Sequence, residues 1–464
     1  MSTVDGITQR ENGLKRLLSK PQLTMIAIGS AIGTGLFLGS GTAIGMAGPS
    51  VILSYAISAL VAFILMACLS EMVVAHPVTG SFGAYAEVYL GGLAGFLVRY
   101  AYWISVVLVI GTEVTAIAVY MQYWAPGSPA WLWIAIFSGA IIYLNTQTVK
   151  VFGAFEYWLA FFKVAAIAAF IVIGSYIVFK TPADSGIGFD NYMEGAGFFP
   201  NGFFGTWSAA IIALFSFIGI EFIAVAAGEA DNPGAAAKSA FKSALFRLVF
   251  FYIFTVALMV AIVPWQMANE RESPFVLVMK LIGIPGSAGI MNFVILTAAL
   301  SAMNAQLYVA SRMIFSLSRT GYAPKMLGKV SAKGVPLNSL FFSTFGVAAA
   351  GLCSVLLDQG TFILMMSIAM FGALFTWLMI FITHWRFRRH YQHHNLTLAF
   401  KVRGFPWTTL VGGTLMAALL GTTLLVPQFR MTLVTGVPLL LVLAIAYRCI
   451  HQRLPTLATL EEKG

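Results

Sequence analysis

The sequence predicts an all-α protein that crosses a membrane many times. Of its 464 residues, 59% are hydrophobic and only 9% are charged, and the mean hydropathy is +0.87. Soluble domains carry about 25% charged residues. Apolar stretches of about 20 residues, the length that spans a bilayer as a helix, recur along the whole chain. Together these observations place the chain among integral membrane proteins.

Twelve apolar segments are predicted to span the membrane. Turn signals separate them, among them Gly48-Pro49, Asn232-Pro233-Gly234 and Gly334-Val335-Pro336. Residues 1–20 are polar and mildly basic and lack the apolar core of a cleaved secretory signal, so we expect the first span to act as an uncleaved signal. The predicted spans are 22–46, 50–74, 94–124, 129–146, 155–179, 204–228, 241–264, 286–315, 337–357, 361–385, 406–426 and 431–450.

The basic residues agree with this number of spans. If the N-terminus is cytoplasmic, 22 of the 27 Lys and Arg fall on the inner side and Lys163 falls inside the fifth span. An excess of Lys and Arg in cytoplasmic loops fixes the orientation of membrane proteins. We therefore predict a multi-pass protein of the bacterial inner (plasma) membrane with both termini cytoplasmic. The basic residues expected on the outer side are Lys180, Arg271, Lys280 and Arg430.

The first span contains a run of glycines that disfavours a continuous helix. Five glycines occur in fourteen residues, from Ile28 to Gly41. Each costs about 1 kcal/mol relative to Ala in a helix interior. A break inside the membrane is tolerated where it is buried in protein or lines a cavity. Close helix packing by small residues is the alternative for this span taken alone. The glycine spacing also resembles a dinucleotide-binding loop, but that motif needs a βαβ unit, which a membrane span does not offer.

A second break is predicted in the sixth span, where Gly219 is followed by Glu221. Gly33 and Gly219 are 186 residues apart, and five spans begin with each break. Interrupted segments at equivalent places in two halves indicate a transporter of inverted repeats. Helix N-termini in such a site suit an anion, and unwound carbonyls suit a cation. A ligand that carries both charges, such as an amino acid, fits this combination.

Several motifs resemble the amino acid–polyamine–organocation superfamily and, within it, the bacterial amino-acid permease family (the amino acid transporter family). The resemblance covers nearly the whole chain. Its motifs are Ile28 to Gly35, Phe217-x-Gly219-x-Glu221, Gly48-Pro49, Gly80-Ser81-Phe82, Phe152-Gly153-x-Phe155-Glu156-Tyr157-Trp158 leading into Lys163, Ala227-Gly228-Glu229 with Asn232-Pro233, Ser311-Arg312-Met313 and Gly321-x-Ala323-Pro324.

The resemblance implies a fold of two inverted five-helix repeats plus two C-terminal helices, with helices 1 and 6 broken. The N–H groups around Gly33, Thr34 and Gly35 would then receive a substrate carboxylate, while Phe215 would cover the substrate as part of a gate. Carbonyls near the breaks would receive the ammonium. The implied substrate-binding residues are Ala31, Ile32, Gly33, Thr34, Gly35, Phe215, Ile218 and Gly219. The implied parts are an N-terminal tail (1–20), the repeats (21–203 and 204–390), helices 11 and 12 (391–451) and a C-terminal tail (452–464).

Three ionisable residues are expected inside the membrane, where such groups are costly and usually functional. By resemblance, Lys163 is the proton-coupling residue; the alternative is a permanently charged lysine that ties span five to carbonyls near span one. Glu113 and Glu221 are candidates for substrate or proton binding, against the alternative of hydrogen-bonded structural carboxyls. Three further carboxylates are expected near cytoplasmic span ends, where they would orient loops: Glu71, Glu156 and Glu229.

Other functions find little support in the sequence. It has no nucleophile–base constellation and no ATP-binding P-loop, so we predict neither an enzyme nor a cofactor. A nucleic-acid partner is not needed to explain the net charge. His384, His390, His393 and His394 have no carboxylate or cysteine at ligand spacing, so no metal is expected. Cys68, Cys353 and Cys449 are isolated and are expected to be buried thiols without a special role.

The expected function is proton-coupled symport of a small, neutral amino acid into the cell by alternating access. The partners would be the amino acid, protons and membrane lipid. An exchanger or a uniporter remains an alternative, as do a cationic amino acid or GABA as the substrate. A non-transporting amino-acid sensor is a further alternative. The sequence does not indicate which amino acid is carried or whether the chain forms oligomers.

Overall fold

The computed structural model describes residues 13–182, 186–193, 196–268, 273–283, 286–356 and 361–451. The regular elements in these ranges are α-helices and 3-10 turns. The one strand-like pairing among the described residues is an isolated parallel bridge between Leu18 and Ala230. The prediction of an all-α protein is therefore confirmed. The C-terminal tail, most of the N-terminal tail and Arg271 lie outside the described residues.

The helices follow the predicted apolar segments, with two short additions, α6 and α13, between them. The α-helices are α2 (Lys20–Ala31), α3 (Thr34–Phe37), α4 (Gly39–Ala47), α5 (Val51–Ala75), α6 (Ser81–Leu90), α7 (Gly92–Met121), α8 (Ala130–Asn145), α9 (Val149–Lys180), α10 (Gly202–Phe215), α11 (Phe222–Ala226), α12 (Pro233–Ile262), α13 (Pro274–Ile282), α14 (Ser287–Arg319), α15 (Leu337–Ser343), α16 (Phe345–Leu356), α17 (Thr361–His393), α18 (Trp407–Thr422) and α19 (Arg430–His451). The 3-10 turns are η1 (Gly48–Ser50), η3 (Phe189–Tyr192), η4 (Ala227–Glu229), η5 (Trp265–Met267), η6 (Lys325–Gly328) and η7 (Pro427–Phe429).

Many of these helices are suited to a membrane. Within the described residues, 7 helical stretches are long and apolar enough to cross a bilayer, and shorter apolar helices accompany them. The shorter ones include α8, α10 and α18. The chain is thus an integral membrane protein by length and composition of its helices.

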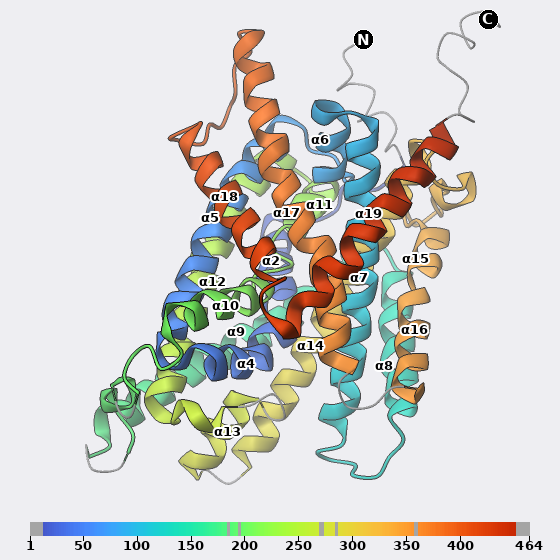
Figure 1. Cartoon of the computed structure of the whole chain (residues 1–464). Coiled ribbons are helices and arrows are strands. Elements are labelled where there is room, and N and C mark those ends of the chain that lie inside the picture. The colour runs from blue at the N-terminus through green and yellow to red at the C-terminus, as the bar shows by residue number, and fades with distance from the viewer. Residues whose placement is uncertain are drawn as a thin grey trace, which may run out of the picture.

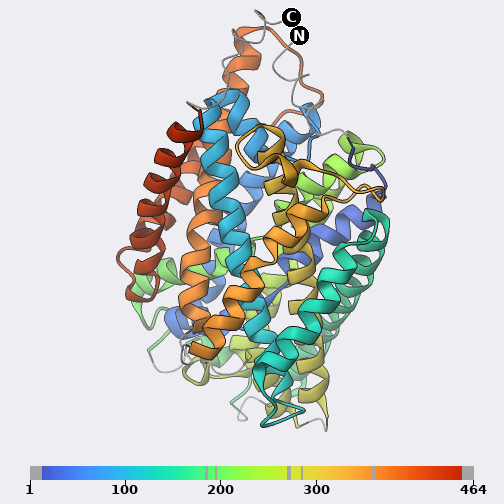
Figure 2. The same cartoon turned by 90° about the vertical axis from the view of Figure 1, so that its right-hand side faces the viewer.

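The interrupted helices lie inside the bundle. α7 packs against α14 and α17, α2 packs against α9 and α12, and α10 packs against α4 and α5. The long helices α9 and α12 thus lie against α2, and the long α5 lies against α10. Figures 1 and 2 show these helices gathered in one bundle. The peripheral α19 is different, because most of its apolar side chains face outward. Cys449 on this helix is exposed, so its predicted burial is wrong; Cys68 is buried, and the side chain of Cys353 lies outside the described residues.

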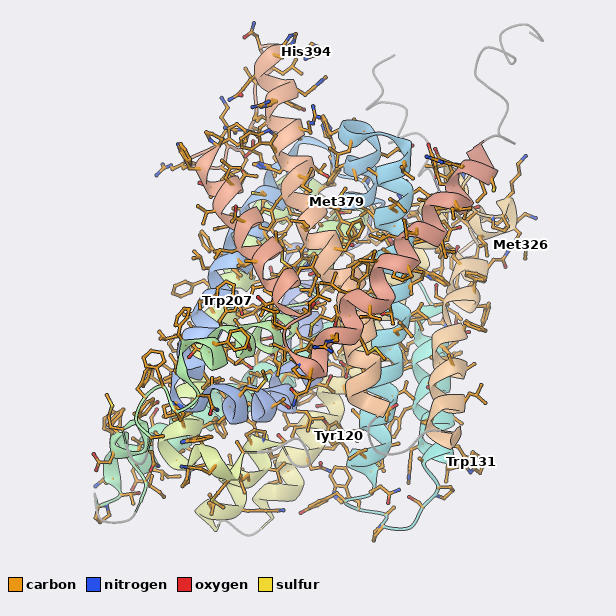
Figure 3. All side chains as sticks on the ribbon, in the orientation of Figure 1. Tyr120, Trp131, Trp207, Met326, Met379 and His394 are labelled. Atoms are coloured by element: carbon orange, nitrogen blue, oxygen red, sulfur yellow. The ribbon has the colours of Figure 1, made fainter. Side chains whose placement is uncertain are left out.

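The two ends of the bundle can be named from the figures. α6 and the last turn of α17, next to His394, lie at one end, which we call the upper end (Figures 1 and 3). α13 and Trp131, at the start of α8, lie at the opposite, lower end. α8 therefore runs from the lower end toward the upper end, and its last residue is Asn145.

Candidate functional site

The first break separates α2 from α3. α2 ends at Ala31, the backbone of Ile32 and Gly33 is extended, and α3 begins at Thr34. The second break is longer: α10 ends at Phe215, and α11 begins only at Phe222. Both interruptions occur at the predicted positions, the first in the glycine run at Gly33 and the second around Gly219. Helix ends leave N–H and C=O groups without partners in their own helix, so each break supplies polar backbone within an apolar bundle.

The two breaks touch each other. The hydroxyl of Ser30, in the last turn of α2, donates a 2.7 Å hydrogen bond to the carbonyl oxygen of Gly219. Gly219 has a φ of +110°, a conformation that L side chains rarely adopt. A Cβ atom at this position would also lie 2.5 Å from the carbonyl oxygen of Ser30. A glycine is therefore required for this approach.

Phe215 covers the first break from the second. A Cβ atom on Gly35 would lie 2.9 Å from Cα of Ser216 and 3.0 Å from the Phe215 ring. The aromatic ring thus lies against the backbone that opens α3. Of the eight residues that the sequence assigns to substrate binding, seven are buried, and Ile218 is partly exposed. The structure brings the residues of both breaks together in one closed region.

Tyr252 of α12 joins the two breaks and was missed by the sequence analysis. Its hydroxyl lies 2.9 Å from the carbonyl oxygen of Ala31 and 2.8 Å from that of Ser216. The carbonyl oxygen of Ala31 also accepts a 3.1 Å hydrogen bond from the N–H of Gly33, so a further donor there would take the place of Tyr252. The carbonyl of Phe215 accepts a 3.2 Å bond from the N–H of Ile218 and, with two lone pairs, can accept one more. One tyrosine among many aromatic residues in apolar spans gives no signal of this role in the sequence.

Glu113 of α7 reaches the first break. The hydroxyl of Thr34 donates a 2.9 Å hydrogen bond to its Oε1 atom. The same oxygen would lie 3.1 Å from a Cβ atom on Gly33. Its other oxygen, Oε2, is buried without a hydrogen-bond partner among the described residues. This carboxyl therefore lies beside the backbone proposed to bind substrate and has room for one more partner.

Glu221 lies at the second break and is more fully engaged. The N–H of Gly219 donates a 3.0 Å hydrogen bond to its Oε2 atom, and the hydroxyl of Tyr102 on α7 donates to Oε1. Its side chain is fully buried. These contacts stabilise the turn after α10 and tie it to α7. They favour the structural alternative for this carboxyl.

Lys163 of α9 binds the broken end of α2. Its ammonium donates hydrogen bonds to the carbonyl oxygens of Gly29 and Ile32, the latter at 2.9 Å, and the side chain is fully buried. The break in the helix leaves these carbonyls without the N–H partners that a continuous helix would provide. Both interpretations of Lys163 require this contact with the first span.

The sequence predicts that Glu156 orients a loop, but the structure places this residue elsewhere. It is fully buried between α9 and α14, where Ser301 donates to Oε1 and Asn304 donates to Oε2 at 2.8 Å. A usable signal was present in the sequence: Glu156 precedes Lys163 by seven residues, which places both on one face of a helix.

The remaining carboxylates lie near the ends of helices. Glu71 accepts hydrogen bonds from Arg388 at 2.7 Å and from the N–H of Val402 at 2.6 Å, so it holds the loop after α17. Glu229 accepts a 2.8 Å bond from Arg312. His384, one of the clustered histidines, contacts Glu71 and Thr409 instead of the other histidines.

Comparison with known proteins agrees with this architecture. The sequence model of the family described as Amino acid permease matches residues 22–456. The chain is 38% identical over 439 residues to the aromatic amino acid transport protein AroP of Escherichia coli strain K12, covering 95% of this chain and 96% of that protein. It is also 38% identical to the amino-acid permease RocC of Bacillus subtilis strain 168, with 93% of each chain covered.

The match extends over the broken helices and over the residues that surround them. A permease is a transport protein and not an enzyme. On this match and on its helical membrane fold, the chain belongs to the amino acid permease family of the amino acid–polyamine–organocation superfamily.

Proposed function

We propose that this protein is a secondary active importer that carries a neutral amino acid together with a proton. The contact between the two helix breaks is the observation that carries the proposal. There, backbone N–H groups and carbonyl oxygens come together in a buried region. A zwitterion satisfies both kinds of group at once. Membership of a permease family supports amino-acid transport as the activity.

The substrate carboxylate would bind the N–H groups of Gly33, Thr34 and Gly35 at the start of α3. Helix N-termini favour anions because their first N–H groups lack acceptors and the helix dipole is positive there. The ammonium would bind carbonyls of Ala31, Phe215 and Ile218, with Ile32 and Gly219 completing the lining. The ring of Phe215, which lies against Gly35, would move to admit the substrate.

Lys163 would couple this site to protons. Its two hydrogen bonds to α2 exist only while the broken end of α2 lies against α9. When the ammonium loses its proton, it loses the charge that strengthens these bonds. The neutral amine would therefore release α2, and loading of the proton would restore the closed arrangement. Glu113, next to Thr34, is the candidate for sensing the substrate or the proton.

The topology that goes with this function has twelve spans. Two inverted repeats (21–203 and 204–390) would each begin with a broken helix, and helices 11 and 12 (391–451) would follow. The upper end would face the cytoplasm of the cell, because the basic residues that precede His394 lie there and basic loops remain inside. Those residues are Arg386, Arg388 and Arg389.

Uptake into proteoliposomes tests the proposal. The purified protein would be offered one labelled amino acid with a panel of unlabelled competitors, with and without an imposed pH gradient. Neutral amino acids should compete best, and aromatic ones belong in the panel because the relative AroP is named for them. Accumulation should require the gradient. Counterflow that is indifferent to the gradient would indicate an exchanger or uniporter, and binding without flux would indicate a sensor.

A further inference from the structure

We propose that Glu156 is a second proton-carrying residue, which takes the transported proton from Lys163 and passes it toward the upper end of the molecule. This inference rests on the proposed function above, in which Lys163 couples transport to protons. It assigns a role to a buried carboxyl that the substrate site does not use.

Glu156 and Lys163 both lie against Gly29. Its carbonyl oxygen accepts a hydrogen bond from the Lys163 ammonium. A Cβ atom on Gly29 would lie 2.6 Å from Oε1 of Glu156, so the carboxyl lies directly against the same residue. Both side chains come from α9, seven residues apart, and therefore project from the same face of that helix. Both are fully buried.

The charges around Glu156 are few. Lys163 is the ionisable group that interacts with it electrostatically, and Glu113 on α7 interacts with Lys163 from the other side. Among the described residues, α2 and α14 present Gly29, Ser301 and Asn304 to it, and none of these titrates. From α12, the hydroxyl of Tyr252 lies at the same end of α2, where it is bonded to Ala31 and Ser216. Within the part of the chain that the structure describes, Glu156 is therefore the titratable acceptor for a proton that leaves Lys163 on this side.

Uncharged polar groups continue from Glu156 toward the upper end. Asn304 donates to Glu156 and accepts a 2.8 Å hydrogen bond from Asn145. Asn145 is the last residue of α8, which begins near Trp131 at the lower end (Figure 3). Its Oδ1 atom is buried without a partner among the described residues. These amides give water a polar place to bind when the upper end opens, so the proton can leave Glu156 for bulk solvent.

The transfer is a simple acid–base step. While α2 lies against α9, the ammonium is held by the carbonyls of Gly29 and Ile32. On transfer, one N–H bond of Lys163 breaks and one O–H bond forms on the Glu156 carboxylate, and the neutral amine then releases α2. A charged pair becomes a neutral amine and a neutral acid, and no other reactant is needed. Water at the upper end then takes the proton and leaves the carboxylate ready for the next cycle.

Glu156→Gln tests this role, because glutamine keeps the size of the carboxyl, can accept from Asn304 and donate to the Ser301 hydroxyl, but cannot carry the proton. Wild-type and variant proteoliposomes would contain a pH-sensitive dye, and proton influx and labelled substrate would be measured together. With one proton per substrate, a gradient of one pH unit corresponds to about 1.36 kcal/mol and sustains roughly tenfold accumulation. We expect the variant to lose proton influx and to equilibrate its substrate without accumulation.

Counterflow separates this role from a structural one. Exchange of labelled for unlabelled substrate does not require the carrier to release its proton, so the variant should retain it. Glu156→Asp should restore proton influx because it restores the acid. If Glu156→Gln retains influx while the wild type shows it, this inference alone is overturned. If the variant loses counterflow and influx to the same degree, Glu156 is only structural. If the wild type itself moves no protons, the proposed function fails and the inference fails with it.

Discussion

The hydroxyl of Ser30 donates a 2.7 Å hydrogen bond to the carbonyl oxygen of Gly219, 189 residues further along the chain, and so joins the two helix breaks. Neither break is therefore an isolated irregularity. Ser30 at the first break satisfies a carbonyl that the second break leaves open, which is how a membrane protein tolerates non-helical chain inside its bundle. A motion that separates the breaks must also break this bond.

Gly219→Ala should abolish transport and destabilise the protein. The added Cβ would lie 2.5 Å from the carbonyl oxygen of Ser30, at a φ of +110°. Backbone strain of this kind costs about 1–3 kcal/mol even without a clash. Uptake and the thermal unfolding temperature in detergent would be measured together. Gly139→Ala is the matched control: nothing lies within 4 Å of its added Cβ in α8, so it should leave uptake unchanged. Normal uptake by Gly219→Ala would contradict the required contact.

Lys163→Ala should lose accumulation that depends on the pH gradient. The substitution removes the hydrogen bonds to Gly29 and Ile32 and leaves no group to load with a proton there. The steady-state ratio of internal to external substrate should fall from roughly tenfold, at a gradient of one pH unit, to about one. Lys150→Ala, at an exposed position in the first turn of the same helix, is the control and should behave as the wild type. Full concentrative uptake by Lys163→Ala would remove Lys163 from the coupling mechanism.

The breaks could be predicted from sequence because their chemistry is local. The backbone conformation at Gly219 suits glycine, and there is no room for a Cβ atom there, so the residue type alone indicates the break. The apolar spans were predictable for a similar reason, since each must supply its own length of apolar residues. α13 was not predicted because a short helix at the lower end of the bundle needs no such length.

The contacts of Glu156 and Tyr252 could not be predicted in the same way. They depend on how α9 and α12 are rotated against α2, which no single segment determines. The sequence around a carboxyl residue near the end of a span is the same whether its side chain faces a loop or the centre of the bundle. Only the spacing between Glu156 and Lys163 carried information about rotation, and it indicated a shared face without showing what that face contacts.

Mild acid should destabilise the fold through His76, which lies just beyond the end of α5. Burial lowers the pKa of His76 from 6.5 to about 4, and its Nε2 atom lies 2.7 Å from the hydroxyl of Tyr89. The unfolded chain therefore binds the proton more readily than the folded one, so stability is full above about pH 6.5 and falls as the pH drops toward 4. The measurement is the unfolding temperature in detergent across this pH range.

His76→Gln should flatten this part of the pH profile, because glutamine keeps a polar side chain and does not titrate. His393→Gln is the control: His393 is exposed at the end of α17, so its loss should leave the profile unchanged. A wild-type profile without a slope between pH 6.5 and 4, or one that His76→Gln leaves intact, would show that His76 is protonated in the fold at little cost.

We expect the ion pair between Glu229 and Arg312 to hold in place the N-terminal segment, which is the stretch of chain just before α2. The Glu229 carboxylate accepts a 2.8 Å hydrogen bond from Arg312, and both side chains are buried. The backbone carbonyl oxygen of Glu229 accepts hydrogen bonds from the N–H groups of Leu17 and Leu18, which precede α2. Removing one partner of a buried ion pair costs about 3–5 kcal/mol because the other charge is left without compensation. Arg312→Met and Glu229→Gln should each lower the unfolding temperature strongly.

The double variant tests whether the cost belongs to the pair. With both charges gone, no uncompensated charge remains, so the double variant should be more stable than Arg312→Met alone. Limited proteolysis gives a second reading, since cleavage near Leu17 should become faster in Glu229→Gln if the segment detaches. Arg403→Gln, at an exposed position in the loop after α17, is the matched loss of a positive charge and should change neither measurement. Additive losses in the double variant would mean that the two residues act independently and that the N-terminal segment is held by its backbone bonds alone.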